Sequence, residues 1–310
     1  MLRNFFYVEK GLFLQSLHPL AALAFLGVLL TLALAFTQPL YLAGIFLVAG
    51  VTVWEAEGLE SWEGYLKIGL VMMILVVLIN ALMVHDGRTV LWRGPFIPVF
   101  GRLTVSLEAI YYGFAMGIRL LDVISIFCLF NLMVHPDKAI NLFSRLAGKS
   151  ALVVALTARM FPLTAQKYEN IRAVQQVRGV DFDRGPLTEK VKKSSALLNC
   201  LMLSALEDSL EIAESMQARA FGSGPRSRYR HYRWQPRDTL CLAGSAIALG
   251  AGLGGLLGSG YGAYTFYPQM DYLIKGPETL AVLLIVLAGF LTPAILSWGW
   301  RRWPFLRSKI

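Results

Sequence analysis

Ionisable side chains are scarce in this sequence, and their scarcity excludes most soluble folds. Asp, Glu, Lys and Arg together make up 16% of the 310 residues, whereas hydrophobic residues make up 56%. A soluble globular domain carries about 25% charged residues. Several apolar stretches approach or exceed the length of about 20 residues that crosses a bilayer. We therefore expect a membrane protein.

Residues that build metal sites, disulfides or catalytic centres are also few. Three cysteines (Cys128, Cys200, Cys241) fit neither a disulfide framework nor metal-ligand spacing, and we expect small buried hydrophobic residues. The four histidines are scattered, without HExxH or paired-carboxylate motifs. Gly148-Lys149-Ser150 resembles the end of a phosphate-binding loop, but the required first glycine would fall at Phe143. The sequence predicts no enzyme, no cofactor and no metal site.

Six apolar stretches separated by polar turns predict an all-α, polytopic membrane protein with about six spans. They are residues 20–36, 40–54, 66–84, 103–134, 240–257 and 279–298. Residues 87–102 contain Gly, Pro and Arg, which favour a loop. Four glycines in the fifth stretch would permit close helix packing, namely Gly244, Gly250, Gly254 and Gly258, and the spacing of the last three is typical of a small-residue face.

Two ionisable residues interrupt the fourth apolar stretch. Arg119 and Asp122 are three positions apart, so they share a helix face and can form an ion pair. Structural pairing is the first expectation, although charges inside a membrane also mark functional sites.

Between the fourth and fifth apolar stretches, the sequence predicts two long amphipathic helices. Residues 151–179 and 187–220 repeat apolar residues every three to five positions, with polar residues between them. Pro162 should kink the first helix or restart it. A short interfacial helix is expected before it, over residues 137–146. The two apolar faces could pack on each other at an angle.

Each amphipathic helix ends in an arginine between small residues. The two motifs are Val177-Arg178-Gly179 and Ala218-Arg219-Ala220, and glycine follows each arginine at Gly179 and Gly222. An arginine at a helix C-terminus is favoured by the dipole and can bond unpaired carbonyls, so ordinary capping is one interpretation. Small neighbours also let another protein bring a carboxylate close to the guanidinium. The more specific interpretation is that each arginine docks another protein.

Acidic residues gather near the end of the second amphipathic helix. They are Glu207, Asp208, Glu211 and Glu214. Because acid near a helix C-terminus is electrostatically unfavourable, these residues either orient Arg219, meet basic residues of a partner, or form a solvated face.

The distribution of basic residues predicts the orientation. Residues 159–237 hold fourteen Lys and Arg, and the C-terminal tail holds four more. Both regions are expected in the cytoplasm, with the N-terminus also inside, although three arginines among residues 88–102 then fall outside.

Arginines and aromatics at residues 223–237 favour a membrane anchor over RNA binding. The expected regions are 1–136 (membrane helices), 137–237 (cytoplasmic coupling region) and 238–310 (membrane hairpin and basic tail).

Several motifs together resemble the transmembrane T component of energy-coupling factor (ECF) transporters, a family that includes cobalt and nickel uptake systems. The resemblance covers residues 12–240 and rests on Leu17-His18-Pro19, Arg119-Leu120-Leu121, His135-Pro136-Asp137, residues 158–163, residues 171–179 and residues 215–222. That family usually has Ala-Arg-Gly at the two helix ends. Val177 and Ala220 depart from this pattern, whereas both arginines are retained.

The resemblance implies a non-catalytic coupling subunit in the inner membrane of a prokaryote. Its partners would be two ABC-type ATPase subunits, identical or different, and a small membrane subunit that binds a vitamin, cobalt or nickel. Residues 177–179 and 218–220 would dock the ATPases, with Pro162, Glu214 and Gly222 in support. No nucleic acid partner is expected. A secondary transporter, or a scaffold without ATPase partners, is the alternative.

Overall fold

The computed structural model describes residues 13–84, 89–97, 101–134, 136–182, 186–224, 234–267, 271–272 and 276–302. The chain divides into two compact units, which we call the membrane unit and the helix-pair unit. The membrane unit comprises Met1–Ala139 and Tyr232–Ile310, and the helix-pair unit comprises Ile140–His231. Residues 225–233, within the expected basic anchor, and the tail beyond Arg302 lie outside the described residues.

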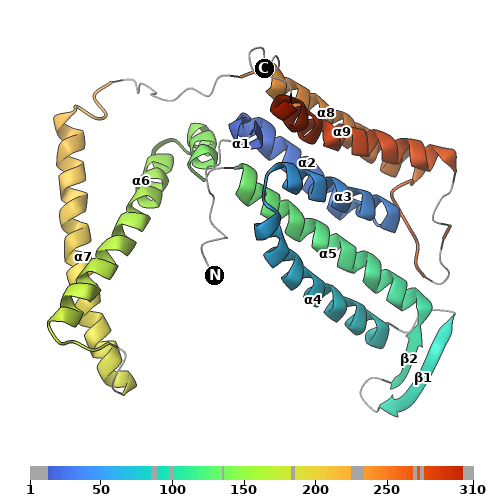
Figure 1. Ribbon diagram of the computed structural model, residues 1–310, viewed down its shortest axis with the longest axis horizontal. Coiled ribbons are helices and arrows are strands. Elements are labelled where there is room, and N and C mark those ends of the chain that lie inside the picture. Colours follow the sequence, from blue (N-terminus) through green and yellow to red (C-terminus); the bar gives the residue numbers. More distant parts are fainter. Residues whose placement is uncertain are drawn as a thin grey trace. The chain divides into compact units, whose positions relative to one another are not determined.

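The membrane unit contains apolar helices and one β-hairpin (Figure 1). Its elements are α1 (Phe13–Ser16), α2 (Pro19–Ala35), α3 (Pro39–Glu55), α4 (Leu59–Met83), β1 (Val90–Ile97), β2 (Gly101–Ser106), α5 (Leu107–Met133), α8 (Pro236–Ser259) and α9 (Pro277–Arg302). Helices α4, α5, α8 and α9 are long and apolar enough to span a membrane, and α2 and α3 are shorter apolar helices. The prediction of an all-α membrane protein is confirmed.

The helix boundaries follow from capping chemistry in the sequence. Four of these helices begin with proline, which lacks the N–H that a first-turn residue leaves unpaired. The Ser106 hydroxyl accepts a bond from the Ala109 N–H at the start of α5. Asp238 caps the start of α8 and also accepts a 2.8 Å bond from the His18 N–H before α2. One carboxylate thus ties the two helix starts together.

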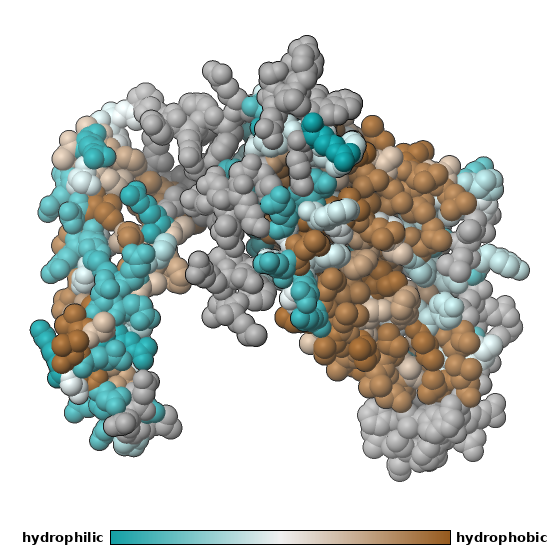
Figure 2. Space-filling model, viewed as in Figure 1, coloured by the Kyte–Doolittle hydropathy of each residue, from teal (hydrophilic) through white to brown (hydrophobic). Residues whose placement is uncertain are grey.

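The core of the membrane unit lies between helices that are distant in sequence. Helix α2 packs on α8 and α5, α3 packs on α5 and α9, and α8 packs on α9. Phe25, Leu29, Ile45 and Phe290 are buried at the centre of this cluster. Helix α4 packs mainly on α5 and exposes most of its apolar side chains. Brown apolar residues therefore dominate the visible face of this unit in Figure 2.

The loop prediction for residues 87–102 is wrong, because an antiparallel β-hairpin occupies most of this stretch. Strand β1 pairs with β2 from Val90↔Ser106 to Ile97↔Gly101. β-branched residues in both segments, and the aromatic residues Trp92 and Phe96 in β1, favour strands. Gly94 and Pro95 fall within the irregular pairing between Arg93 and Phe96, where a missing N–H disrupts no regular ladder bond.

The predicted ion pair between Arg119 and Asp122 is not formed. The Arg119 guanidinium instead donates a 2.5 Å hydrogen bond to the Phe36 carbonyl, just after α2. Carbonyls at helix C-termini lack a partner within the helix and attract such donors. Asp122 is 0% exposed, and neither carboxylate oxygen has a hydrogen-bond partner among the described residues.

Close packing of α8 through glycine is confirmed at Gly244, whereas the other three predicted glycines do not contribute, and Gly252 adds a second close contact. A Cβ on Gly244 would lie 2.8 Å from the Gly289 carbonyl of α9, and one on Gly252 would lie 2.8 Å from Leu32 of α2. A Cβ on Gly250, Gly254 or Gly258 would meet nothing within 4 Å. The expected small-residue face is therefore open in this chain.

Two further predictions need correction. Cys128 and Cys241 are buried, but Cys200 is exposed on a polar helix. Helix α6 (Pro136–Val177) runs through Pro162 without a restart and absorbs the separate helix expected at residues 137–146. A proline loses only one backbone hydrogen bond, which a long helix tolerates when its neighbours remain helical.

Candidate functional site

The candidate site lies on α6 and α7 (Leu187–Ala218), the long helices of the helix-pair unit. The chain reverses direction between them, so the C-terminal ends of the two helices lie at opposite ends of the pair (Figure 1). The Lys193 ammonium bonds the Asp181 carbonyl in the turn that follows Arg178. Arg219 comes 26 positions after Lys193 along α7, a separation of about 39 Å at 1.5 Å per residue. The two arginine motifs are therefore widely separated.

The first arginine motif closes α6 with a Schellman motif. The Val180 N–H bonds the Gln175 carbonyl at 3.0 Å, and the Gly179 N–H bonds the Gln176 carbonyl at 2.9 Å. Gly179 has φ +89°, the left-handed conformation that this motif requires. Arg178 thereby occupies the C-cap position.

The second motif repeats this geometry bond for bond. The Phe221 N–H bonds the Met216 carbonyl at 3.0 Å, and the Ala220 N–H bonds the Gln217 carbonyl at 2.9 Å. Here the left-handed position is held by Ala220, with φ +54°. Gly222, which the sequence suggested as the terminating glycine, has φ +93° two residues later. Gly179 and Ala220 are structurally equivalent.

Both arginines project from exposed helix ends. Arg178 and Arg219 are exposed, and Val177 beside the first is 90% exposed. Across the described residues, neither guanidinium forms an ion pair within 4 Å. Each tip thus presents an uncompensated cation and a small neighbouring residue to solvent, which is what a partner's carboxylate needs for close approach.

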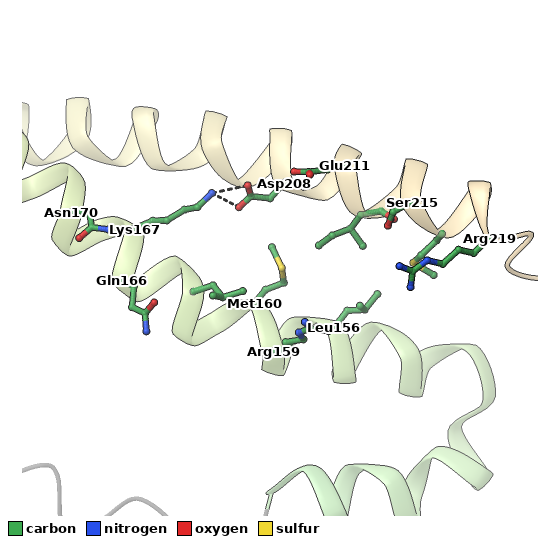
Figure 3. A pocket seen from close by; sticks show the side chains of 13 residues that line it. Leu156, Arg159, Met160, Gln166, Lys167, Asn170, Asp208, Glu211, Ser215 and Arg219 are labelled. Atoms are coloured by element: carbon green, nitrogen blue, oxygen red, sulfur yellow. Dashed lines mark hydrogen bonds and ion pairs between the residues drawn. The ribbon is translucent and has the colours of Figure 1, made fainter. Parts of the chain in front are cut away.

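A groove of about 680 Å³ separates α6 from α7. It is lined by apolar side chains from both helices and by charged residues along its length, as Figure 3 shows. Arg219 belongs to this lining, and so does Arg159 of α6, which lies in the motif run of the sequence but was not predicted as a site residue. Arg178 is absent from the lining, so the two tips differ in their surroundings.

The two helices are joined across this groove by a polar bridge that sequence analysis missed. The Lys167 ammonium of α6 donates to both carboxylate oxygens of Asp208 on α7, at 2.5 and 2.6 Å. It also donates to the Ser204 hydroxyl at 3.0 Å. The available signal was opposite charge, since Lys167 and Asp208 lie on two amphipathic helices that were expected to pack on each other.

The predicted supporting residues occupy different places. Pro162 lies inside α6, five positions before Lys167. Glu214 is exposed and does not line the groove, whereas Asp208 and Glu211 do. The acidic residues near the end of α7 are therefore divided, since Asp208 binds Lys167 and Glu214 faces solvent.

Helix α7 also carries an exposed apolar row. Leu198, Met202, Leu206 and Leu210 follow one another at four-residue spacing, and each is at least half exposed. Residues at i and i+4 lie on one face of a helix. An exposed row of four large apolar side chains is typical of an interaction surface.

Comparisons with known proteins identify the family of the chain. The family model described as cobalt transport protein (CbiQ) matches residues 13–230. The energy-coupling factor transporter transmembrane protein EcfT of Bacillus subtilis is 28% identical over 225 residues, covering 69% of this chain and 82% of the relative. The protein of that name from Staphylococcus aureus is 25% identical over 248 residues, covering 76% and 90%.

A relative of lower sequence identity also matches over most of its length. The EcfT protein of Thermotoga maritima is 23% identical over 249 residues, covering 76% of this chain and 86% of the relative. The family match includes α6, α7 and both arginine motifs, and it ends before α8 and α9. The chain therefore belongs to the family of transmembrane energy-coupling T components of ECF transporters.

Proposed function

We propose that this chain transmits conformational change from two ABC-type ATPase subunits to a separate substrate-binding membrane subunit. The observation that carries the proposal is a pair of helix ends closed by the same hydrogen-bond pattern, each with an exposed arginine, at opposite ends of one helix pair. Two widely separated, equivalent contacts suit a dimer of motor subunits, because each subunit can hold one tip. ATP hydrolysis then belongs to the partners, and this chain is a non-catalytic coupling subunit.

Recognition at each tip would be electrostatic. Arg178 and Arg219 would each donate to an acidic group in a groove of one ATPase, with residues 177, 179, 218 and 220 allowing close approach. A charge-assisted hydrogen bond of this kind contributes about 1.5–3 kcal/mol. Such a contact is strong enough to hold an assembly when two act together.

The exposed apolar row of α7 would contact the substrate-binding subunit. That subunit is itself a membrane protein, so its surface is apolar and complementary to Leu198, Met202, Leu206 and Leu210. Tilting of α6 and α7 would then move the substrate-binding subunit, and a vitamin or a transition-metal ion such as cobalt or nickel would enter the cell. The basic helix-pair unit would lie in the cytoplasm of a prokaryote, beneath its inner membrane.

Co-purification and transport test this function. Arg178→Ala and Arg219→Ala should each weaken ATPase binding by roughly 10- to 100-fold, and the double variant should abolish ATP-dependent uptake. Glu207→Gln removes an exposed charge beside the Lys167–Asp208 bridge, about 16 Å along the helices from either tip, and should change neither measurement. If the double variant keeps the complex and the transport, the proposed docking is wrong and a carrier or scaffold without ATPases becomes the better explanation.

A further inference from the structure

The Lys167–Asp208 bridge occupies the same position relative to both arginine tips. Lys167 lies 11 residues before Arg178 on α6, and Asp208 lies 11 residues before Arg219 on α7. Eleven residues are about three helical turns, so each bridge residue points from nearly the same face as its arginine. The bridge is therefore about 16 Å along the helix from either tip.

The bridge is complete as a polar contact. An ammonium group has three N–H donors, and those of Lys167 have three acceptors: Asp208 Oδ1, Asp208 Oδ2 and Ser204 Oγ. Both side chains are only about one-third exposed, at 36% and 30%. A satisfied, half-buried contact of this kind specifies one geometry.

The surroundings of the bridge leave it as the specific contact that fixes the angle between α6 and α7. The groove between α6 and α7 is open, so apolar packing alone does not fix the angle between the helices. In Figure 3 Lys167 reaches across from α6 to Asp208, while Met160, Leu156 and Arg219 line the groove further along. A specific contact at one point of an open crossing acts as a pivot.

We propose that Lys167 and Asp208 are positioning residues that hold the two helices at a fixed crossing, so that displacement of one arginine tip is transmitted to the other. This role rests on the proposed coupling function. Without the bridge, each tip moves independently, and the ATPases hydrolyse ATP without moving the substrate-binding subunit. Ser204 supports the bridge by binding the third ammonium proton.

A distance measurement tests the pivot without any partner protein. Spin labels at Ala158 and Gln217 report one end of the pair, and labels at Gln176 and Asn199 report the other, in the full chain in lipid nanodiscs with Cys200→Ser. All four positions are exposed. Asp208→Asn should broaden both distance distributions, and Lys167→Asp/Asp208→Lys should narrow them again. Glu207→Gln, which neutralises the neighbouring exposed acid, should leave them unchanged. Unchanged distributions in Asp208→Asn overturn the proposal.

Reconstituted transport tests the consequence. Lys167→Met and Asp208→Asn should lower the uptake per ATP hydrolysed by about fivefold, the scale of a partly exposed ion pair, while the complex and its hydrolysis remain. Lys167→Arg and the charge swap should restore the ratio, which a merely structural role would not predict. A swap no better than the single variants overturns the pivot. Absence of ATP-dependent uptake in the unmodified complex instead overturns the proposed function and leaves the distance result standing.

Discussion

Ala220 occupies a backbone position that favours glycine. Its φ of +54° costs an L-residue about 1–2 kcal/mol, whereas glycine adopts this conformation without steric penalty. The equivalent position in the first motif is glycine, at Gly179, and Ala220 is exposed, so its methyl group adds little packing. The departure from the Ala-Arg-Gly pattern at Ala220 therefore introduces backbone strain.

Ala220→Gly should therefore stabilise the end of α7 by about 1 kcal/mol, and Gly179→Ala should destabilise the end of α6 by a similar amount. Hydrogen exchange of the Phe221 amide, which bonds the Met216 carbonyl, should slow about fivefold in Ala220→Gly. Ala213→Gly inside α7 is the matched control and should weaken the helix. Faster exchange at Phe221 in Ala220→Gly would contradict the strain argument.

Asp122 is buried in a way that should lower the stability of the protein. The carboxylate is 0% exposed and has no hydrogen-bond partner among the described residues. Asp122→Ala removes both unpaired oxygens and should raise the free energy of unfolding by about 1–3 kcal/mol, measured by thermal unfolding in detergent. Glu108→Gln is the control, since buried Glu108 accepts a 3.1 Å bond from the Thr89 N–H. That variant should gain no stability.

At the scale of elements, α8 and α9 are held together by glycines that let their backbones approach. Gly244→Ala would place a methyl group 2.8 Å from the Gly289 carbonyl and should destabilise the membrane unit by about 1–3 kcal/mol. Gly250→Ala meets nothing within 4 Å and should be neutral or slightly stabilising. Thermal unfolding of both variants under the same conditions checks this, and equal losses would refute the packing difference.

The apolar row of α7 gives a second prediction for an element. Leu206→Gln should reduce co-purification of the substrate-binding subunit while the ATPases stay bound, because only the apolar face is altered. Glu207→Gln, at the adjacent exposed position, serves as the control. Loss of the ATPases together with the substrate-binding subunit would argue against separate surfaces for the two partners.

At the scale of the whole molecule, a natural cysteine can report on which side of the membrane α7 lies. Cys200 is exposed on α7, whereas Cys128 and Cys241 are buried. A membrane-impermeant maleimide should label Cys200 only after cells are permeabilised. Ala263→Cys, at an exposed position between α8 and α9, should react in intact cells when Cys200 is replaced by serine. Labelling of Cys200 from outside would reverse the proposed orientation.

Sequence alone was sufficient for the class of protein, the apolar helices and the two arginine motifs. Runs of apolar residues, N-terminal prolines and three-to-four spacing are local signals, and local signals determine helices. They also indicated the family, since its motifs are contiguous stretches of chain. The hairpin was missed because glycine and proline obscured the strand propensity around them.

Only the tertiary structure decided which side chains meet. Arg119 binds the Phe36 carbonyl instead of Asp122, Gly244 and not Gly250 touches a neighbouring helix, and Lys167 reaches Asp208 across a groove. Each outcome depends on which face of a helix meets another helix, and helical periodicity alone leaves that choice open. The physical reason is that partners distant in sequence compete for the same donor or the same space, and packing selects among them.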